Sequence, residues 1–262
     1  MAVRGPYGDT VDSRLSRSEC HPIRVLWAVP RSVSTAFERM VIERHDHTVF
    51  DEPFSVPYYF GPDRASERFT EERPDATWPS VLTSLLDAST TGPVFVKDMA
   101  AHAAPVLSAP LLGHFTNSFL FRDPRRVIVS LARKWPDVTF EELGFAALEQ
   151  AYEVAAAVAG PERPPVLIDA HDLLADPAGV IRAWCEASGL DFRPEALTWE
   201  PGLQPQWQLW RDWYDGVAKT SGFEPAAHRP PPATDDPRLA ALAERAMPIY
   251  ERLRAKALGH RP

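Results

Sequence analysis

The stretch IRVLWAVPRSVSTAFERMV, residues 23–41, contains the pattern that decides the fold. Residues 23–29 form a nearly continuous apolar run, which is typical of a strand buried on both faces of a parallel sheet. Pro30 ends this run, and from Ser34 onward apolar side chains such as Phe37 recur at helical spacing. The stretch therefore predicts a buried strand, a short loop and a helix.

The same order of strand, loop and helix recurs along the chain. Four further apolar runs predict strands within residues 47–54, 93–98, 118–123 and 165–170. Helices are predicted near residues 81–88, directly after the fourth strand, over 141–159, from Asp176-Pro177 and from Asp236-Pro237. This alternation indicates an α/β fold with a mainly parallel central sheet of about five strands and helices on both faces. Ligands on such sheets bind beyond the carboxyl ends of the strands.

The composition is that of a globular protein. Of the 262 residues, 45% are hydrophobic and 24% are charged, which favours a packed core over disorder. We expect a flexible segment over residues 1–21 and a single α/β domain over residues 22–262. Within that domain, residues 55–92 and 191–234 are irregular and rich in aromatic residues and proline, and we expect them to form the acceptor or lid regions.

Charge and cysteine content exclude several classes of protein. The net charge of −8 argues against a general nucleic-acid coat. Cys20 and Cys185 are too few for a disulfide framework, and no cluster of His, Cys or carboxylate residues has metal-ligand spacing, so we expect no metal. There is no signal-peptide pattern and no apolar window of about 18 residues, so we expect a cytoplasmic protein without a membrane span. The oligomeric state is not defined by the sequence.

The loop that follows the first strand has the composition of an anion-binding site. It reads Pro30-Arg31-Ser32-Val33-Ser34-Thr35 and leads directly into a helix. The start of a helix combines unpaired N–H groups with a positive dipole end, and this loop adds hydroxyl groups and a guanidinium group. The alternative is a polar connection with a serine at the helix cap. The chain has no Gly-Lys-Ser/Thr triplet, which argues against an ordinary ATP or GTP site.

A second group of polar residues follows the fourth strand. Arg122 stands at the strand end in Phe121-Arg122-Asp123-Pro124, and Ser130 follows eight residues after Arg122. A guanidinium group can hold a phosphate through two hydrogen bonds, and a serine hydroxyl can complete the contact. The alternative is a surface ion pair between Arg122 and Asp123.

Taken together, the two motifs resemble those of the sulfotransferases that use 3′-phosphoadenosine 5′-phosphosulfate (PAPS). PRSVSTA, residues 30–36, is similar to the loop of that family that binds the 5′-phosphosulfate group. FLFRDPRRVIVSL, residues 119–131, resembles its 3′-phosphate-binding segment, and VLIDAHDLLADPAGVI, residues 166–181, resembles its fifth strand and following helix. The resemblance covers roughly residues 23–190.

The resemblance implies a P-loop-like scaffold and a donor site. It implies that PAPS is the donor, that 3′-phosphoadenosine 5′-phosphate (PAP) is the product, and that the acceptor is a hydroxyl or amine of a small or lipid-like molecule. The donor-binding residues that it implies are Arg31, Ser32, Val33, Ser34, Thr35, Arg122 and Ser130. Two alternatives stay open, namely a phosphotransferase or other nucleotide-using enzyme on the same scaffold, and a nucleotide-binding protein without turnover.

Val33 stands where the family carries glycine. Glycine there would allow a positive φ and a close approach of the backbone to phosphate. A β-branched residue is sterically disfavoured at positive φ. We therefore expect a relaxed loop in which Val33 has a negative φ.

Four side chains at or shortly after strand ends are candidates for proton transfer. Glu52, in Phe50-Asp51-Glu52-Pro53, is the predicted general base, because several carbohydrate sulfotransferases carry a glutamate in a similar turn and a carboxylate can take the acceptor proton. Asp51 is its rival for that role, and a turn-capping carboxylate is the alternative reading. His102 is the second candidate for the base, and His171, after the fifth strand, is a weaker one.

Lys97, at the end of the third strand, is the predicted cationic catalytic residue. A lysine there can reach the bridging oxygen of the donor and stabilise charge on the leaving phosphate. The alternative is a surface ion pair between Lys97 and Asp98.

The segment near the C-terminus carries two further patterns. Lys219-Thr220-Ser221-Gly222 loosely resembles the loop, rich in glycine and lysine, with which PAPS enzymes close over the nucleotide; an ordinary turn is the alternative. The aromatic side chains before it fit either an acceptor pocket or lid, or one face of a helix that packs in the core. These are Trp207, Trp210, Trp213 and Tyr214.

Overall fold

The computed structural model describes residues 20–224 and 234–259, so the predicted flexible segment 1–21 lies almost entirely outside the described residues. Five strands form one sheet in which every neighbouring pair is parallel, in the order β2-β3-β1-β4-β5. The fold class predicted from the sequence is confirmed. The strands are β1 (Ile23–Ala28), β2 (Thr48–Asp51), β3 (Val94–Met99), β4 (Phe115–Phe121) and β5 (Val166–Asp169).

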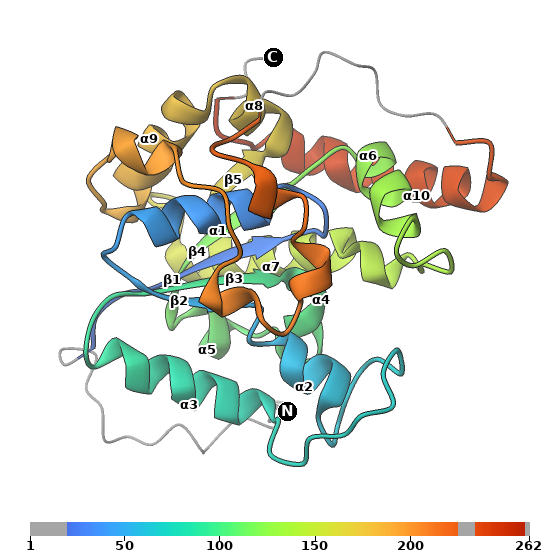
Figure 1. Cartoon of the computed structure of the whole chain (residues 1–262), viewed down its shortest axis with the longest axis horizontal. Coiled ribbons are helices and arrows are strands. Elements are labelled where there is room, and N and C mark those ends of the chain that lie inside the picture. The colour runs from blue at the N-terminus through green and yellow to red at the C-terminus, as the bar shows by residue number, and fades with distance from the viewer. Residues whose placement is uncertain (1–19, 225–233, 260–262) are drawn as a thin grey trace.

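Helices cover both faces of the sheet (Figure 1). On the central strand β1, Val25 and Trp27 join one core, whereas Leu26 and Ala28 join the other. This explains the continuous apolar run, because alternate side chains of a strand point to opposite faces and both faces are buried. One core is completed by α1 (Ser34–Glu43), α8 (Ala170–Ala175) and α9 (Pro177–Ser188). The other is completed by α3 (Trp78–Ser89), α5 (Ala109–Leu112), α6 (Pro124–Ala132), α7 (Phe145–Ala159) and α10 (Pro237–Arg254).

Two predicted helical regions differ from the expectation. The helix expected over 141–159 is interrupted at Gly144, whose φ of 73° separates the short turn η2 (Glu141–Leu143) from α7. The aromatic residues from Trp207 to Tyr214 do not share a helix, because the chain forms a series of short turns here, between Pro205 and Gly216. Those turns are η4 (Pro205–Trp207), η5 (Arg211–Trp213) and η6 (Val217–Lys219), preceded by η3 (Pro194–Leu197).

The irregular region 55–92 contains α3 and one helix that the sequence did not predict, α2 (Ser55–Phe60). Short helical turns also follow β3, namely α4 (Ala100–Ala103) and η1 (Ala104–Val106). In the described ranges, no helix combines the length and the apolar character that a membrane span needs. Because all five strands are parallel, the residues that follow them gather at one edge of the sheet.

Candidate active site

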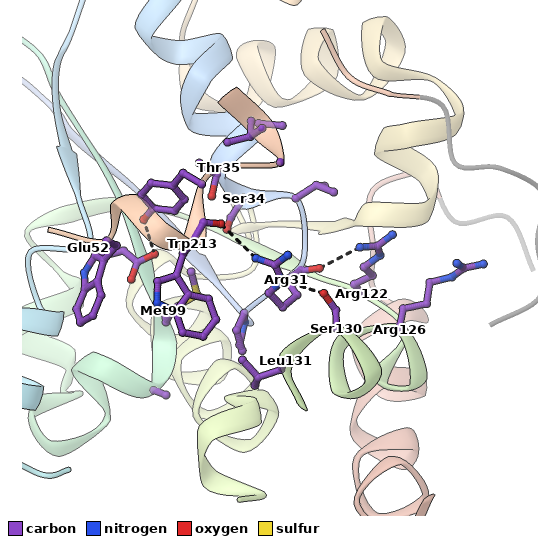
Figure 2. A pocket seen from close by; sticks show the side chains of 18 of the residues that line it. Arg31, Ser34, Thr35, Glu52, Met99, Arg122, Arg126, Ser130, Leu131 and Trp213 are labelled. Atoms are coloured by element: carbon purple, nitrogen blue, oxygen red, sulfur yellow. Dashed lines mark hydrogen bonds between the residues drawn. The ribbon is translucent and has the colours of Figure 1, made fainter. Parts of the chain in front are cut away.

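A cavity of about 570 Å³ lies at the carboxyl edge of the sheet. Its lining comes from the loop after β1, the ends of β2 and β3, α2, α6 and the segment 210–224. Figure 2 shows Arg122 and Arg126 at one end of this cavity, Glu52, Met99 and Trp213 at the other, and Arg31 between them, where its Nη1 donates to the carbonyl oxygen of Trp213 at 3.4 Å. We call the two ends the arginine end and the aromatic end.

The arginine end brings the two sequence motifs into direct contact. Arg31 Nε donates a hydrogen bond to Ser130 Oγ at 2.9 Å, and Arg122 Nη1 donates to the carbonyl oxygen of Arg31 at 3.1 Å. Ser34 and Thr35, in the first turn of α1, line the same cavity. The first turn of a helix presents N–H groups without intrahelical partners. Guanidinium, hydroxyl and amide donors therefore converge on one volume.

Electrostatics at the arginine end favour an anion. Burial lowers the pKa of Arg31 and of Arg122, and the charges of neighbouring arginines lower it further. Within the described part of the chain, neither side chain has a carboxylate at ion-pair distance. Positive charges that are crowded and partly desolvated without an internal counter-ion are stabilised by an anionic ligand.

The lining of the donor site differs from the expectation at two residues. Ser32 does not line the cavity, because its hydroxyl turns inward and donates to the carbonyl oxygen of Val29 at 2.7 Å. Arg126, which sequence analysis missed, lines the arginine end beside Arg122 and Ser130. Residues 122, 126 and 130 are spaced by four on α6 and its cap, so the helical period was the signal that could have found it.

The expectation that Val33 has a negative φ is wrong. Its φ is 66°, and that of Arg31 is 59°. Val33 is the N-cap of α1, where its carbonyl oxygen accepts hydrogen bonds from the N–H groups of Ala36 and Phe37, both at 3.1 Å. The helix start and the packing of the valine side chain against the α1 core hold the left-handed conformation. Glu52, also in the cavity lining, has a φ of 48°, so strained residues cluster at this site.

Replacing Val33 with glycine is expected to raise the free energy of unfolding by about 1 kcal/mol. Strain at such a position costs about 1–3 kcal/mol, and the greater backbone freedom of glycine in the unfolded chain offsets part of the gain. Affinity for PAP is expected to stay the same or to increase. Urea unfolding and calorimetry measure the two quantities. Val33→Ala is the control, since it loses packing but keeps the strain and is expected to destabilise. If glycine destabilised as much as alanine, packing would outweigh strain here.

Glu52 lines the aromatic end and belongs to a buried hydrogen-bonded cluster. Lys97 Nζ donates to Glu52 Oε1 at 2.6 Å and lies 2.5 Å from Asp51 Oδ1. The Tyr214 hydroxyl is 2.8 Å from Asp51 Oδ2 and 3.1 Å from Glu52 Oε1. Glu38, on α1, completes the cluster, with its Oε2 3.7 Å from Lys97 Nζ. The cluster therefore contains three carboxyl groups and one ammonium group.

Burial and neighbouring charges give these three carboxyl groups different pKa values. Burial raises the pKa of Asp51 to about 6, although Lys97 opposes the rise. Burial and the charge of Asp51 raise the pKa of Glu38 well above its usual range. For Glu52, burial acts upward, but the charges of Lys97 and His102 and two hydrogen bonds outweigh it and lower the pKa. Glu52 is therefore ionised at neutral pH, while Glu38 is held protonated.

The location of Lys97 differs from both sequence-based readings. Its ammonium group is enclosed by the carboxyl groups and does not line the cavity, so this arrangement gives it no direct contact with a bound donor. The alternative of a surface pair with Asp98 is wrong, because both side chains are fully buried. Lys97 acts on the site through Glu52.

His102 is held by a buried carboxylate. Its Nδ1 lies 2.8 Å from Asp98 Oδ1, while Asp98 Oδ2 accepts a hydrogen bond from the N–H of Phe54 at 2.6 Å. His102 lines the cavity, and in the described ranges its Nε2 has no hydrogen-bond partner. Asp98 was not predicted, although its spacing of four from His102 was the available signal. By contrast, His171 is exposed and does not line the cavity.

The aromatic segment contributes to both the core and the cavity. Trp210, Trp213 and Tyr214 line the cavity, whereas Trp207 is buried with its Nε1 3.3 Å from Glu38 Oε2. Of the predicted closing loop, Thr220 and Gly222 line the cavity. Lys219 and Ser221 are exposed and lie outside the lining.

Comparison with known proteins agrees with this geometry. A family model described as a sulfotransferase domain matches residues 23–257, and the chain therefore belongs to the sulfotransferase-domain family. The sulfotransferase domain of the olefin synthase from Synechococcus PCC 7002 matches with a TM-score of 0.52 at 17% identity, over 87% of this chain and 94% of that domain. This second match shows a shared fold.

Two curated relatives come from Arabidopsis thaliana. Branched-chain-amino-acid aminotransferase-like protein 2 is 27% identical over 236 residues, and protein 1 is 26% identical over 233 residues. Each match covers 87% of this chain, which spans only 40% and 41% of the two relatives. The two relatives are therefore much longer than this chain, and their names describe those longer proteins.

Proposed function

We propose that this protein transfers a sulfonate group from PAPS to a hydroxyl or amine group of a small-molecule acceptor. The observation that carries the proposal is that the two ends of the cavity differ in charge. Two guanidinium groups without a carboxylate partner in the described residues meet the first turn of α1 at one end. The ionised Glu52 and the Asp98-held His102 lie at the other end. A nucleotide polyanion bound at the first end would face a proton acceptor across one volume.

The donor set fits PAPS. Arg31, Ser34, Thr35 and the first turn of α1 would hold the 5′-phosphosulfate, since these are the donors that follow β1. Arg122 and Ser130 would hold the 3′-phosphate, with Arg126 beside them. When bound, PAPS supplies the sulfonate: the acceptor oxygen or nitrogen bonds to sulfur, the bond from sulfur to the bridging oxygen breaks, and its electron pair leaves with PAP.

The chain's own residues then handle the proton and the charge. Glu52 is the proposed proton acceptor, and His102 is the alternative. Lys97 and the Tyr214 hydroxyl hold Glu52 Oε1 in place through hydrogen bonds. Arg31 stabilises the charge that develops on the leaving phosphate, because positive groups aimed at that charge lower the barrier.

The alternatives receive less support from the site. Nucleoside triphosphate chemistry lacks its usual lysine, since the chain has no Gly-Lys-Ser/Thr triplet. The names of the curated relatives suggest aminotransfer, which uses a lysine Schiff base to pyridoxal phosphate. Within residues 20–224 and 234–259, no lysine lines the cavity. Calorimetry with PAP, ADP and GTP in parallel tests the proposal; tight binding of PAP alone supports it, and a preference for GTP contradicts it.

Substituting Arg122 by alanine is expected to weaken PAP binding by about tenfold or more. A hydrogen bond to a charged group contributes about 1.5–3 kcal/mol, and each 1.4 kcal/mol is about tenfold in affinity. Binding of adenosine 5′-phosphosulfate, which lacks the 3′-phosphate, is expected to change much less. Arg125→Ala is the matched control, because Arg125 is exposed and paired with Asp123. Equal losses for both ligands would show that Arg122 does not hold the 3′-phosphate.

A further inference from the structure

The aromatic end of the cavity has a continuous wall of rings. Ring centroids are 4.8 Å apart for Tyr58 and Tyr59, 5.5 Å for Tyr59 and Trp210, 6.2 Å for Tyr59 and Trp135, and 4.9 Å for Trp135 and Trp213. All five side chains line the cavity. The negative faces of tyrosine and tryptophan rings attract organic cations. Arg68 already lies 4.4 Å from the centroid of the Trp135 ring and Lys134 lies 5.9 Å from that of Trp213, whereas in the described residues no protein cation lies over Tyr58, Tyr59 or Trp210.

Most charges of the cavity lie toward one end or the other, and a further carboxylate, that of Glu224, also lines it. Its lining arginines are Arg122 and Arg126, at the arginine end, and Arg31, which extends from that end as far as the carbonyl oxygen of Trp213. In the described ranges, the charged groups that line the aromatic end are the carboxylates of Glu52 and Glu142. The side chain of Glu142 is paired with Arg68, whose guanidinium group lies over the Trp135 ring and outside the lining.

The cluster behind Glu52 adds to this negative potential. Lys97 balances only one of the nearby carboxylates, and Asp51, with a pKa of about 6, is ionised alongside Glu52 at neutral pH. A bound donor would place further negative charge at the opposite end. An anionic acceptor would therefore meet repulsion from both directions, whereas a cation would meet attraction.

Tyr59 offers the aromatic end an unused polar group. The residue is 5% exposed, lines the cavity, and has no hydrogen-bond partner for its hydroxyl in the described part of the chain. Burial raises the pKa of Tyr59 well above its usual range, so the hydroxyl is neutral. The fully buried side-chain atoms without a partner in the described residues do not include this hydroxyl, so it faces the open cavity and can bond to a polar group of a ligand.

From the ring wall, the carboxylates beside it and the Tyr59 hydroxyl, we infer that the acceptor is an organic cation: a protonated or quaternary amine that also carries the hydroxyl that receives the sulfonate. This inference rests on the proposed function and deepens it. The ammonium group would lie against the tryptophan and tyrosine faces, near Glu142. The hydroxyl would point toward Glu52 and His102, which take its proton as the new bond to sulfur forms.

Three phenols that share ring and hydroxyl but differ in the charge of the side chain test the inference. Tyramine is cationic, para-ethylphenol is neutral and para-hydroxyphenylpropionate is anionic. Each is titrated at up to millimolar concentration into the protein, with and without PAP. We expect tyramine to bind about twofold to thirtyfold tighter than para-ethylphenol, as one desolvated cation–π contact gives, and the anion to bind weakest.

PAP binding is measured in a separate titration. The proposed function and the cationic acceptor can therefore be contradicted independently of each other. If PAP binds but the three phenols bind equally, or the anion binds best, or none binds, the cationic acceptor is overturned and the proposed function stands. If PAP does not bind, the proposed function falls, and the order of the phenols without PAP still decides whether the cavity prefers a cation.

A matched pair of variants locates the effect. Glu142→Gln is expected to weaken tyramine binding by about threefold and to leave para-ethylphenol unchanged, since partly exposed charge pairs contribute little more. Glu141→Gln changes an exposed carboxylate outside the cavity and is expected to change neither. Equal weakening of all three phenols by Glu142→Gln would show that Glu142 only supports the wall, and would overturn its part in cation recognition.

Discussion

Replacing Glu52 with glutamine is expected to lower the rate of sulfonate transfer by about 10²–10⁴-fold, the usual contribution of a general base. Glutamine keeps the shape of the side chain and an acceptor oxygen for Lys97 and Tyr214, but it cannot take a proton. Because Glu52 lies at the end opposite to the arginines, affinity for PAP is expected to be nearly unchanged. Steady-state kinetics and calorimetry measure the two effects.

His102 supplies the control for this assignment. Its imidazole is positioned by Asp98 and reaches the same cavity. If Glu52 is the base, His102→Ala is expected to have the smaller effect on turnover, and Asp98→Asn a smaller one still. If instead His102→Ala causes the larger loss and Asp98→Asn reduces the rate with it, His102 takes the proton and Asp98 is its positioning residue.

Local patterns were sufficient for most of the fold. The β1 run alternates between two cores, so its sequence already showed burial on both faces. The starts of α9 and α10 were readable from Asp176-Pro177 and Asp236-Pro237, where the aspartates accept hydrogen bonds from N–H groups in the first turn. Helix interruption at Gly144 and the short turns after Trp207 depend on backbone conformations that spacing alone does not report.

The site was only partly readable, for a physical reason. Residues that follow parallel strands gather at one edge, so Arg31, Glu52 and Arg122 could be placed together from topology alone. Glu38 and Tyr214 could not, because they reach the cluster from the interior of α1 and from a distant turn. The sequence also cannot show that the ammonium group of Lys97 is enclosed by carboxyl groups and does not line the cavity. That outcome depends on which side chains surround it in the folded protein.

Val33 shows where a local rule fails. Steric preference alone predicts a negative φ for valine, yet hydrogen bonds at the start of α1 and packing of its side chain impose the opposite sign. Arg31 and Glu52 share this feature, and all three line the cavity. Backbone strain at functional sites is maintained by the surrounding structure. Its presence here agrees with a site in which the position of the backbone is fixed at the expense of favourable φ values.

Replacing Lys97 with methionine is expected to lower the free energy of unfolding at pH 7 by about 3–5 kcal/mol, the usual effect of removing one partner of a buried ion pair. Methionine fills a similar volume, so the loss comes from charge. Asp51 and Glu52 would remain buried beside each other and near Glu38 without a cation. Lys256→Met, at an exposed position, is the control and is expected to change stability little.

The pH dependence distinguishes this electrostatic loss from a packing defect. Without Lys97, the pKa values of Asp51 and Glu52 in the folded protein must rise, because the cation that favours their ionised forms is gone. A carboxyl group whose folded pKa is raised contributes stability that is present below its unfolded pKa and is lost as pH rises through its folded pKa. The gap between variant and wild type, measured by urea unfolding, is therefore expected to shrink from pH 7 toward about pH 4. A gap that stays constant over that range would mean that Lys97 stabilises the fold by packing alone, and its place as the charge partner of Glu52 would have to be given up.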